Sequence, residues 1–95
     1  MKDLLINGTR FLTTDEIADA TLEYASVLSQ FQRVDTIRFP AIVGGTAAQT
    51  AVAVGVGAHV VVIDAPDVIP VRLTGATEAA ESIRRQQADY GDTAG

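Results

Sequence analysis

Residues 50–56 constrain the fold more than any other part of the chain. They alternate strictly, with valines on one side and alanine or glycine on the other. A period of two predicts a β-strand, and apolar residues on both sides predict a strand that is covered on both faces. Residues 59–64 continue the pattern after a Gly-Ala turn, so we expect a second such strand, folded back beside the first.

The chain also begins with extended structure. Apolar residues 4–6 and residues 9–12 flank the dipeptide Asn7-Gly8. Asn-Gly between two such runs favours a type I′ hairpin, because both central residues of that turn need a positive φ. The alternative is a single strand with a bulge at Gly8.

A helix is predicted over about residues 14–32. Thr13 is placed to cap its first N–H groups, and Glu16 completes a capping box three residues later. Apolar residues then recur at helical spacing and define one buried stripe. The stripe consists of Ile17, Ala20, Tyr24, Val27, Leu28 and Phe31.

Residues 36–43 are rich in β-formers and predict a strand with one solvated face. Pro40 has no N–H for a ladder, so we expect this strand at a sheet edge or with a bulge. The dipeptide Gly44-Gly45 predicts a turn at its end. Further along, residues 70–73 are long enough for one more short strand, and Thr74 or Thr77 is placed to cap a second helix that ends at about Gln87.

The element order is therefore β(β)-α-β-β-β-(β)-α. Hairpin-length connections favour an α+β fold with a small antiparallel or mixed sheet of about four to five strands. One main amphipathic helix is expected to pack on one face. At 95 residues the chain fits a single domain, for which we expect residues 1–88, with a flexible C-terminal tail at 89–95.

The second sheet face lacks a strong candidate to cover it, because Ile83 is the only large residue on the inner stripe of the second predicted helix. A second copy of the chain would supply the missing cover, which predicts a homodimer or higher oligomer. A different protein partner is the alternative. The expected self-association face consists of Ala51, Val52, Ala53, Val54 and Val56.

Composition excludes several kinds of function. The net charge of -5 argues against nucleic-acid binding, which needs clustered Lys and Arg. The absence of Cys excludes disulfides, thiolate metal sites and thiol catalysis. No apolar run is long enough to span a membrane, and the N-terminus lacks the pattern of a signal peptide, so we expect a cytoplasmic protein.

The candidate ligand-binding residues carry weak signals. His59 is the one histidine, and Asp64 and Asp67 flank an Ala-Pro turn where carboxylates suit a hard metal ion or acid–base chemistry. Gly44 and Gly45 resemble a loop that cradles an anion, but the P-loop and dinucleotide spacings are absent. Structural roles explain these residues better: turn chemistry for Asp64, Asp67, Gly44 and Gly45, and a solvent-exposed position at the start of a strand for His59.

No cofactor is expected from this sequence, and no metal site is assigned. No motif in it names a reaction, so an enzyme is the less favoured reading. The hypothesis that fits best is a non-catalytic protein-interaction or self-assembly module. Two alternatives stay open: a small-ligand or metal-binding domain, and an enzyme whose site is shared between subunits.

Overall fold

The computed structural model describes residues 1–65 and 72–94 and has an α+β fold with one antiparallel sheet. The predicted fold class is confirmed, with five strands in the spatial order β4-β3-β2-β1-β5 and two helices. In chain order the elements are β1 (Lys2–Ile6), β2 (Thr9–Thr13), α1 (Asp15–Gln30), β3 (Val34–Val43), β4 (Thr46–Gly55), β5 (Val60–Asp64) and α2 (Ala76–Ala94).

The predicted N-terminal hairpin is confirmed. Asn7 and Gly8 have φ values of 51° and 85°, as a two-residue type I′ turn requires. The turn closes on the pair Ile6 and Thr9, and β1 and β2 stay in register over their whole length. The hairpin therefore presents alternate residues to opposite faces of the sheet.

The start of α1 differs from the prediction by one residue. Thr14, not Thr13, is the N-cap, and its hydroxyl accepts a hydrogen bond from the Ile17 N–H at 3.3 Å. Thr13 is the last residue of β2, and its buried hydroxyl donates to the Pro40 carbonyl at 2.9 Å. The expected capping box of Thr13 and Glu16 is wrong, because the Thr13 hydroxyl bonds the Pro40 carbonyl of β3 instead of capping the helix.

The position of Pro40 also corrects an expectation. β3 is an interior strand, and Pro40 lies opposite Gln49 of β4 without a bulge in the register. The N and the carbonyl of one strand residue point to the same side, and the Pro40 carbonyl faces Thr13 of β2. On that side β2 and β3 share a single paired position, Leu12 opposite Ile42. The missing donor of proline therefore costs no ladder bond to β4.

The partner of β5 was predicted wrongly. β4 and β3 form a hairpin through Gly44 and Gly45, as expected, but β5 does not fold back beside β4. It pairs antiparallel with β1 at the other end of the sheet. The turn at Asn7 fixes this choice: the Asn7 N–H donates to the His59 carbonyl at 2.9 Å, and the Asn7 side-chain carbonyl accepts from the His59 N–H at 2.9 Å. β4 is consequently left as an edge strand.

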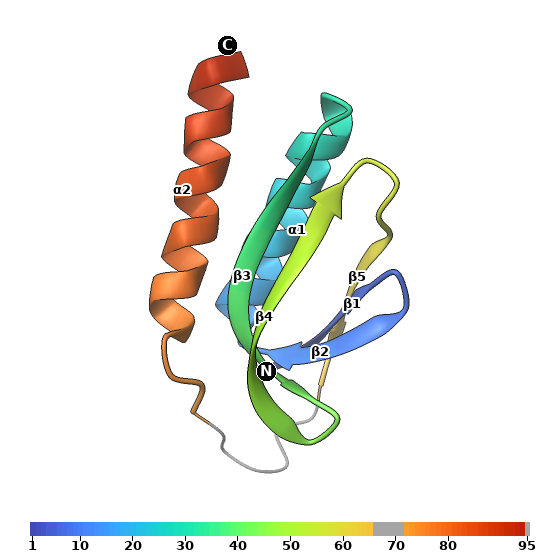
Figure 1. Cartoon of the computed structure of the whole chain (residues 1–95), viewed down its shortest axis with the longest axis vertical. Helices are drawn as coiled ribbons and strands as arrows, with labels where there is room; N and C mark the ends of the chain where they lie inside the picture. Colours follow the sequence, from blue (N-terminus) through green and yellow to red (C-terminus); the bar gives the residue numbers. More distant parts are fainter. Residues whose placement is uncertain (66–71, 95) are drawn as a thin grey trace.

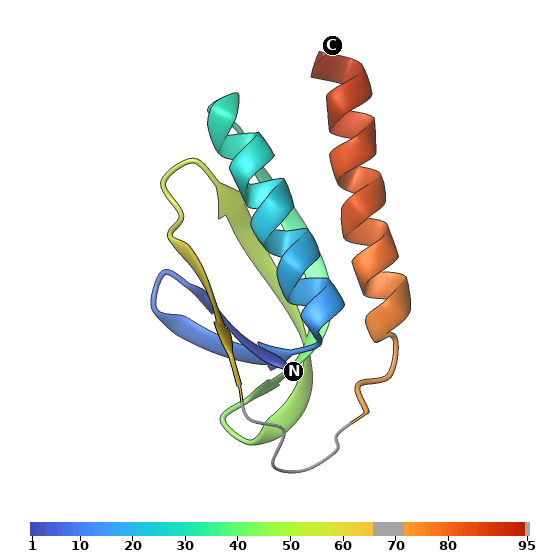
Figure 2. The same ribbon diagram turned by 180° about the vertical axis from the view of Figure 1, so that it is seen from behind.

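Both helices lie on the same face of the sheet (Figures 1 and 2), where one main helix was expected. α1 contacts β4 and β5, the two edge strands, so the sheet bends around it. α2 packs against α1 and β3, with Ala80 and Ile83 buried, and Arg84 bonds Glu23 of α1 at 2.8 Å. α2 continues to Ala94, beyond its expected end and into the segment predicted as a tail. The strand expected at 70–73 falls largely outside the described residues, and Arg72 and Leu73 are not in a strand.

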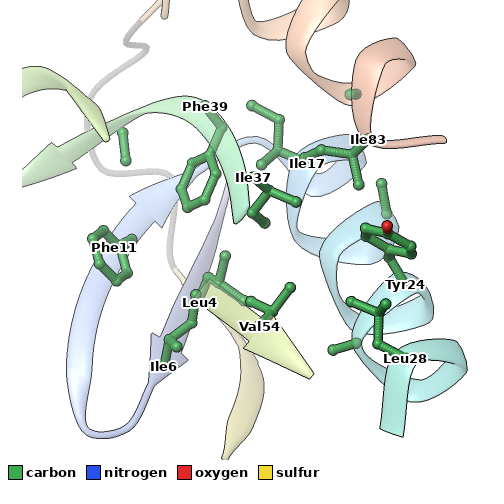
Figure 3. Packing of buried hydrophobic residues seen from close by; sticks show 14 residues of the cluster. Leu4, Ile6, Phe11, Ile17, Tyr24, Leu28, Ile37, Phe39, Val54 and Ile83 are labelled. Carbon is green, nitrogen blue, oxygen red and sulfur yellow. The ribbon is translucent and has the colours of Figure 1, made fainter. Parts of the chain in front are cut away.

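The core lies between the sheet and the helices (Figure 3). Its strand residues come mostly from alternate positions, as the period of two requires, except that Phe39, Pro40 and Ala41 of β3 are three consecutive buried residues. Its largest fully buried side chains include Leu4, Ile17, Tyr24, Leu28, Ile37, Phe39, Val54 and Ile83. On the opposite side of the sheet, which we call the outer face, Val61 and Ile63 are about half exposed, so the described part of this chain does not itself supply the second cover that was expected.

Candidate interaction surfaces

The outer face carries an apolar patch, which consists of Leu5, Leu12, Ile42, Val61 and Ile63. Leu5 lies at its centre, directly opposite Val61 on β5 and diagonal to Ile63 and Leu12. Val61 is 49% exposed and Ile63 is 48% exposed, which is high for side chains of this size in a sheet. Asp3 lies between Leu12 and Ile63 on the same face, and Arg10 lies opposite Leu5, so two charged residues adjoin the patch. Exposed apolar side chains gathered on one face are typical of surfaces that contact another protein.

One long segment of the chain carries no charge, and it supplies Ile42, Val61 and Ile63 of the patch. Asp, Glu, Lys and Arg are all absent between Arg38 and Asp64, in a chain with seven basic and twelve acidic residues. This uncharged segment forms the second half of β3, all of β4 and nearly all of β5. Both edges of the sheet are thus almost free of charge, while the helices carry most of the acidic side chains. Depletion of charge is the compositional mark of an interface core.

The five residues predicted for self-association are divided between two faces. Ala51 and Ala53 point to the outer face and are exposed. Val54 points to the helices and is fully buried, and Val52 beside it is partly buried. Val56 follows the end of β4 and is 47% exposed. Val54 therefore serves the core, and Ala51 and Ala53 are the members that remain open to a partner.

The predicted ligand-binding residues do not form one site. Gly44 and Gly45 make the β3–β4 turn, whereas His59 and Asp64 lie at opposite ends of β5. The Asp64 side chain is 92% exposed, with Lys2 Nζ at 4.0 Å. Asp67 lies outside the described residues. Within residues 1–65 and 72–94, no three His, Cys, Asp or Glu side chains are grouped as metal ligands.

A polar network that sequence reasoning missed joins α1, β3 and α2. The Tyr24 hydroxyl donates to Asp35 Oδ2 at 2.5 Å, and Gln86 Nε2 donates to the same oxygen at 3.0 Å. The Thr36 N–H donates to Asp35 Oδ1 at 2.8 Å, and Gln86 also donates to the Thr36 carbonyl at 3.0 Å. The carboxylate thus accepts bonds from two helices and from its own strand.

These bonds change the acidity of both groups. Burial acts to raise the pKa of Asp35, but the hydrogen bonds from Tyr24, Thr36 and Gln86 outweigh it and hold that pKa below its ordinary value. Burial raises the pKa of the Tyr24 hydroxyl, and the hydrogen bond to Asp35 raises it further. Asp35 is therefore an anion at neutral pH, bonded to a neutral phenol.

The network borders an open cleft of about 610 Å³ between the C-terminal end of α1 and α2. Phe31, 49% exposed, and Tyr90 contact each other across it with ring centroids 5.6 Å apart. The cleft is lined by Tyr24, Leu28, Phe31, Arg33, Val34, Asp35 and Tyr90. A volume of this size suits a small molecule or one large side chain.

The sequence held few signals for this cleft. Tyr24 and Phe31 belong to the predicted buried stripe of α1, but nothing in the pattern links either residue to Asp35 or to Gln86.

In the described part of the chain, neither helix is long and apolar enough to cross a membrane. Comparison with known protein families, with curated proteins and with solved structures finds no match to this chain.

Proposed function

We propose that this chain is a non-catalytic module that works by protein–protein contact, and first of all by contact with further copies of itself. The observation that carries the proposal is the apolar patch on the outer face, with Val61 and Ile63 about half exposed where no described element covers them. The uncharged segment between Arg38 and Asp64 supports it, since two copies with a net charge of -5 each repel one another least where they meet through uncharged surface.

The test is sedimentation velocity on the wild type and on a double variant, Val61→Lys with Ile63→Lys. Both side chains are half exposed, so the fold tolerates lysine there and the circular dichroism spectrum stays unchanged. We expect the wild type to associate as concentration rises and the double variant to associate more weakly, because it loses the contact at the patch. Leu22→Lys is the matched control, because Leu22 is 40% exposed on α1, away from the patch, and its substitution leaves association unchanged.

Two results would contradict the proposal. A wild type that stays monomeric over about a hundredfold range of concentration leaves the patch without a role in self-assembly. Equal loss of association in the double variant and in Leu22→Lys would indicate a general effect of added charge rather than a contact at the patch.

A second candidate function rests on the cleft. Asp35 is an anion at its base, and Phe31 and Tyr90 form an aromatic wall, which together suit a small amine or guanidine with an apolar body. A thermal-shift screen of small primary amines and guanidines tests this function. A stabilisation that Asp35→Asn abolishes supports it, and no shift with any of these compounds excludes this class of ligand.

A further inference from the structure

Every second residue of β4 directs its backbone N–H and carbonyl groups at the open edge of the sheet. Gly44 and Gly45 form a two-residue hairpin turn, so Val43 and Thr46 bond each other across it. Even-numbered residues of β4 therefore direct their N–H and carbonyl groups at β3, and odd-numbered residues direct theirs at the edge. The Val56 N–H, which donates to the Arg33 carbonyl at 3.0 Å, follows the same rule.

Two of the edge-facing residues, Ala51 and Ala53, are the most accessible to another strand. The Gly55 carbonyl already accepts from the Ala58 N–H at 3.1 Å. Residues 72–74 border β4 near Ala47 and Gln49, where they share a shallow hollow. Ala51 and Ala53 lie between these two regions, are exposed, and form no hydrogen bond through their edge-facing backbone groups to any described residue.

The edge also lacks the features that keep sheet edges from pairing. Natural edge strands are blunted by Lys, by Pro, by a bulge or by being short. β4 is ten residues long, contains no charged residue and no proline, and stays in unbroken register with β3. β5, the strand at the other edge, is only five residues long and ends in the charged residue Asp64, so it is protected against pairing with another strand.

We propose that β4 pairs antiparallel with β4 of a second copy about a two-fold axis beside Val52, so that two sheets become one. This inference rests on the proposed function and adds a second contact to the one at the apolar patch. A two-fold axis there sets Ala51 opposite Ala53 of the second copy, and the reverse, and each such pair exchanges two N–H to carbonyl bonds. Methyl side chains let the two edges approach without a clash.

Charge favours a second copy over another acidic protein segment as the occupant. The pairing brings together two strands that carry no charge. The charged residue beside the contact is Arg38, opposite Ala51 on β3, so the acidic residues that give each copy its net charge of -5 do not lie on the paired strands. On the helical side of the sheet, Thr50 and Val52 are only partly covered by α1. The same symmetry brings Val52 of the two copies together and removes both from water.

Thiol pairing tests the register directly, because the chain contains no cysteine. Ala51→Cys and Ala53→Cys are prepared as separate variants, one of them with a tag that changes its mass, and are mixed in a glutathione redox buffer. Paired residues in an antiparallel ladder lie at a separation that a disulfide spans. We expect the mixed disulfide to exceed either homodimeric disulfide at least about fivefold, and a statistical mixture would overturn the register.

A proline substitution tests the contact itself. Ala51→Pro removes an edge-facing N–H and no bond to β3, so it keeps the fold and lowers the association constant at least about tenfold. Ala51→Thr, which keeps the N–H, is the matched control and leaves association near the wild-type level. If Ala51→Pro fails to fold, the thiol experiment still decides.

The outcomes separate this inference from the proposed function. Association that survives Ala51→Pro but is lost in the double lysine variant of the apolar patch overturns pairing through β4 and leaves the proposed function standing. A wild type that stays monomeric at every concentration overturns both.

Discussion

The Tyr24 hydroxyl donates a hydrogen bond to the Asp35 carboxylate at a distance of 2.5 Å and joins the middle of α1 to the start of β3. Gln86 brings α2 to the same oxygen. α1 and β3 follow each other in the chain but α2 is remote from both, so this carboxylate fixes how both helices sit on one face of the sheet. The buried tyrosine ring packs into the core, while its hydroxyl reaches the cleft.

Tyr24→Phe tests the contribution of that hydrogen bond. The ring still fills its place in the core, but Asp35 keeps only the bonds from Thr36 and Gln86. We expect the free energy of unfolding to fall by about 1–2 kcal/mol, since the acceptor is charged and partly buried. Urea denaturation measures it. Tyr90→Phe is the control and changes stability by less than about 0.5 kcal/mol, because the ring contact with Phe31 is retained.

The same pair predicts how stability depends on pH. The pKa of Asp35 is lower in the folded chain than in the unfolded chain, so its contribution is present above the unfolded value of about 4 and is lost as pH falls through the lower folded value. The pKa of Tyr24 is raised on folding, so its contribution is lost as pH rises above about 10. The stability difference between wild type and Asp35→Asn should therefore shrink on acidification below pH about 4, as measured by urea denaturation. A difference that stays constant down to pH about 2 would contradict this assignment.

Two adjacent threonines test the start of α1. Thr14→Ala removes the cap on the Ile17 N–H and should cost about 1 kcal/mol, with Thr14→Ser restoring most of it. Thr13→Val keeps the side-chain volume but leaves the Pro40 carbonyl without its donor, at a cost of about 1–3 kcal/mol. Thermal unfolding measures both. A neutral Thr14→Ala would mean that the cap has been assigned to the wrong residue.

Gly55 is required where β4 ends. Its φ is 127°, and a Cβ there would lie 2.1 Å from the Arg33 carbonyl oxygen. Gly55→Ala should lower the free energy of unfolding by about 3 kcal/mol or more, because backbone strain and overlap add. Gly8→Ala is the control: φ is 85° there, but nothing lies within 4 Å, so the cost is about 1 kcal/mol. Equal costs in a denaturant titration would mean that the close approach at Gly55 is unimportant.

The sequence predicted local structure better than pairing. Asn7-Gly8 and Gly44-Gly45 each define a turn chemically, and both hairpins form where these dipeptides occur. Local sequence patterns could not identify the strand that pairs with β5, because the valines of β5 suit a position at either edge of the sheet. Bonds between Asn7 and His59, remote in the chain, settle the choice. Apolar residues on both sides of a strand predicted cover on both faces, and the described part of this chain covers one of them.

The candidate surfaces were predicted in part. Alternation identified Ala51 and Ala53 as one side of a strand, and the structure leaves that side exposed. Alternation gave no sign of which side faces α1, so Val54 was grouped with them although it is buried. The bond between Tyr24 and Asp35 depends on how α1 returns to β3, which no periodicity describes.

Solution mass measured by light scattering on a sizing column, over about a hundredfold range of concentration, tests the central claim most directly. The account predicts a mass that rises from the monomer toward the dimer or beyond as concentration increases, because the outer face and the β4 edge are both open. A mass that stays at 10.0 kDa throughout would contradict it and show that these surfaces do not bring copies of the chain together.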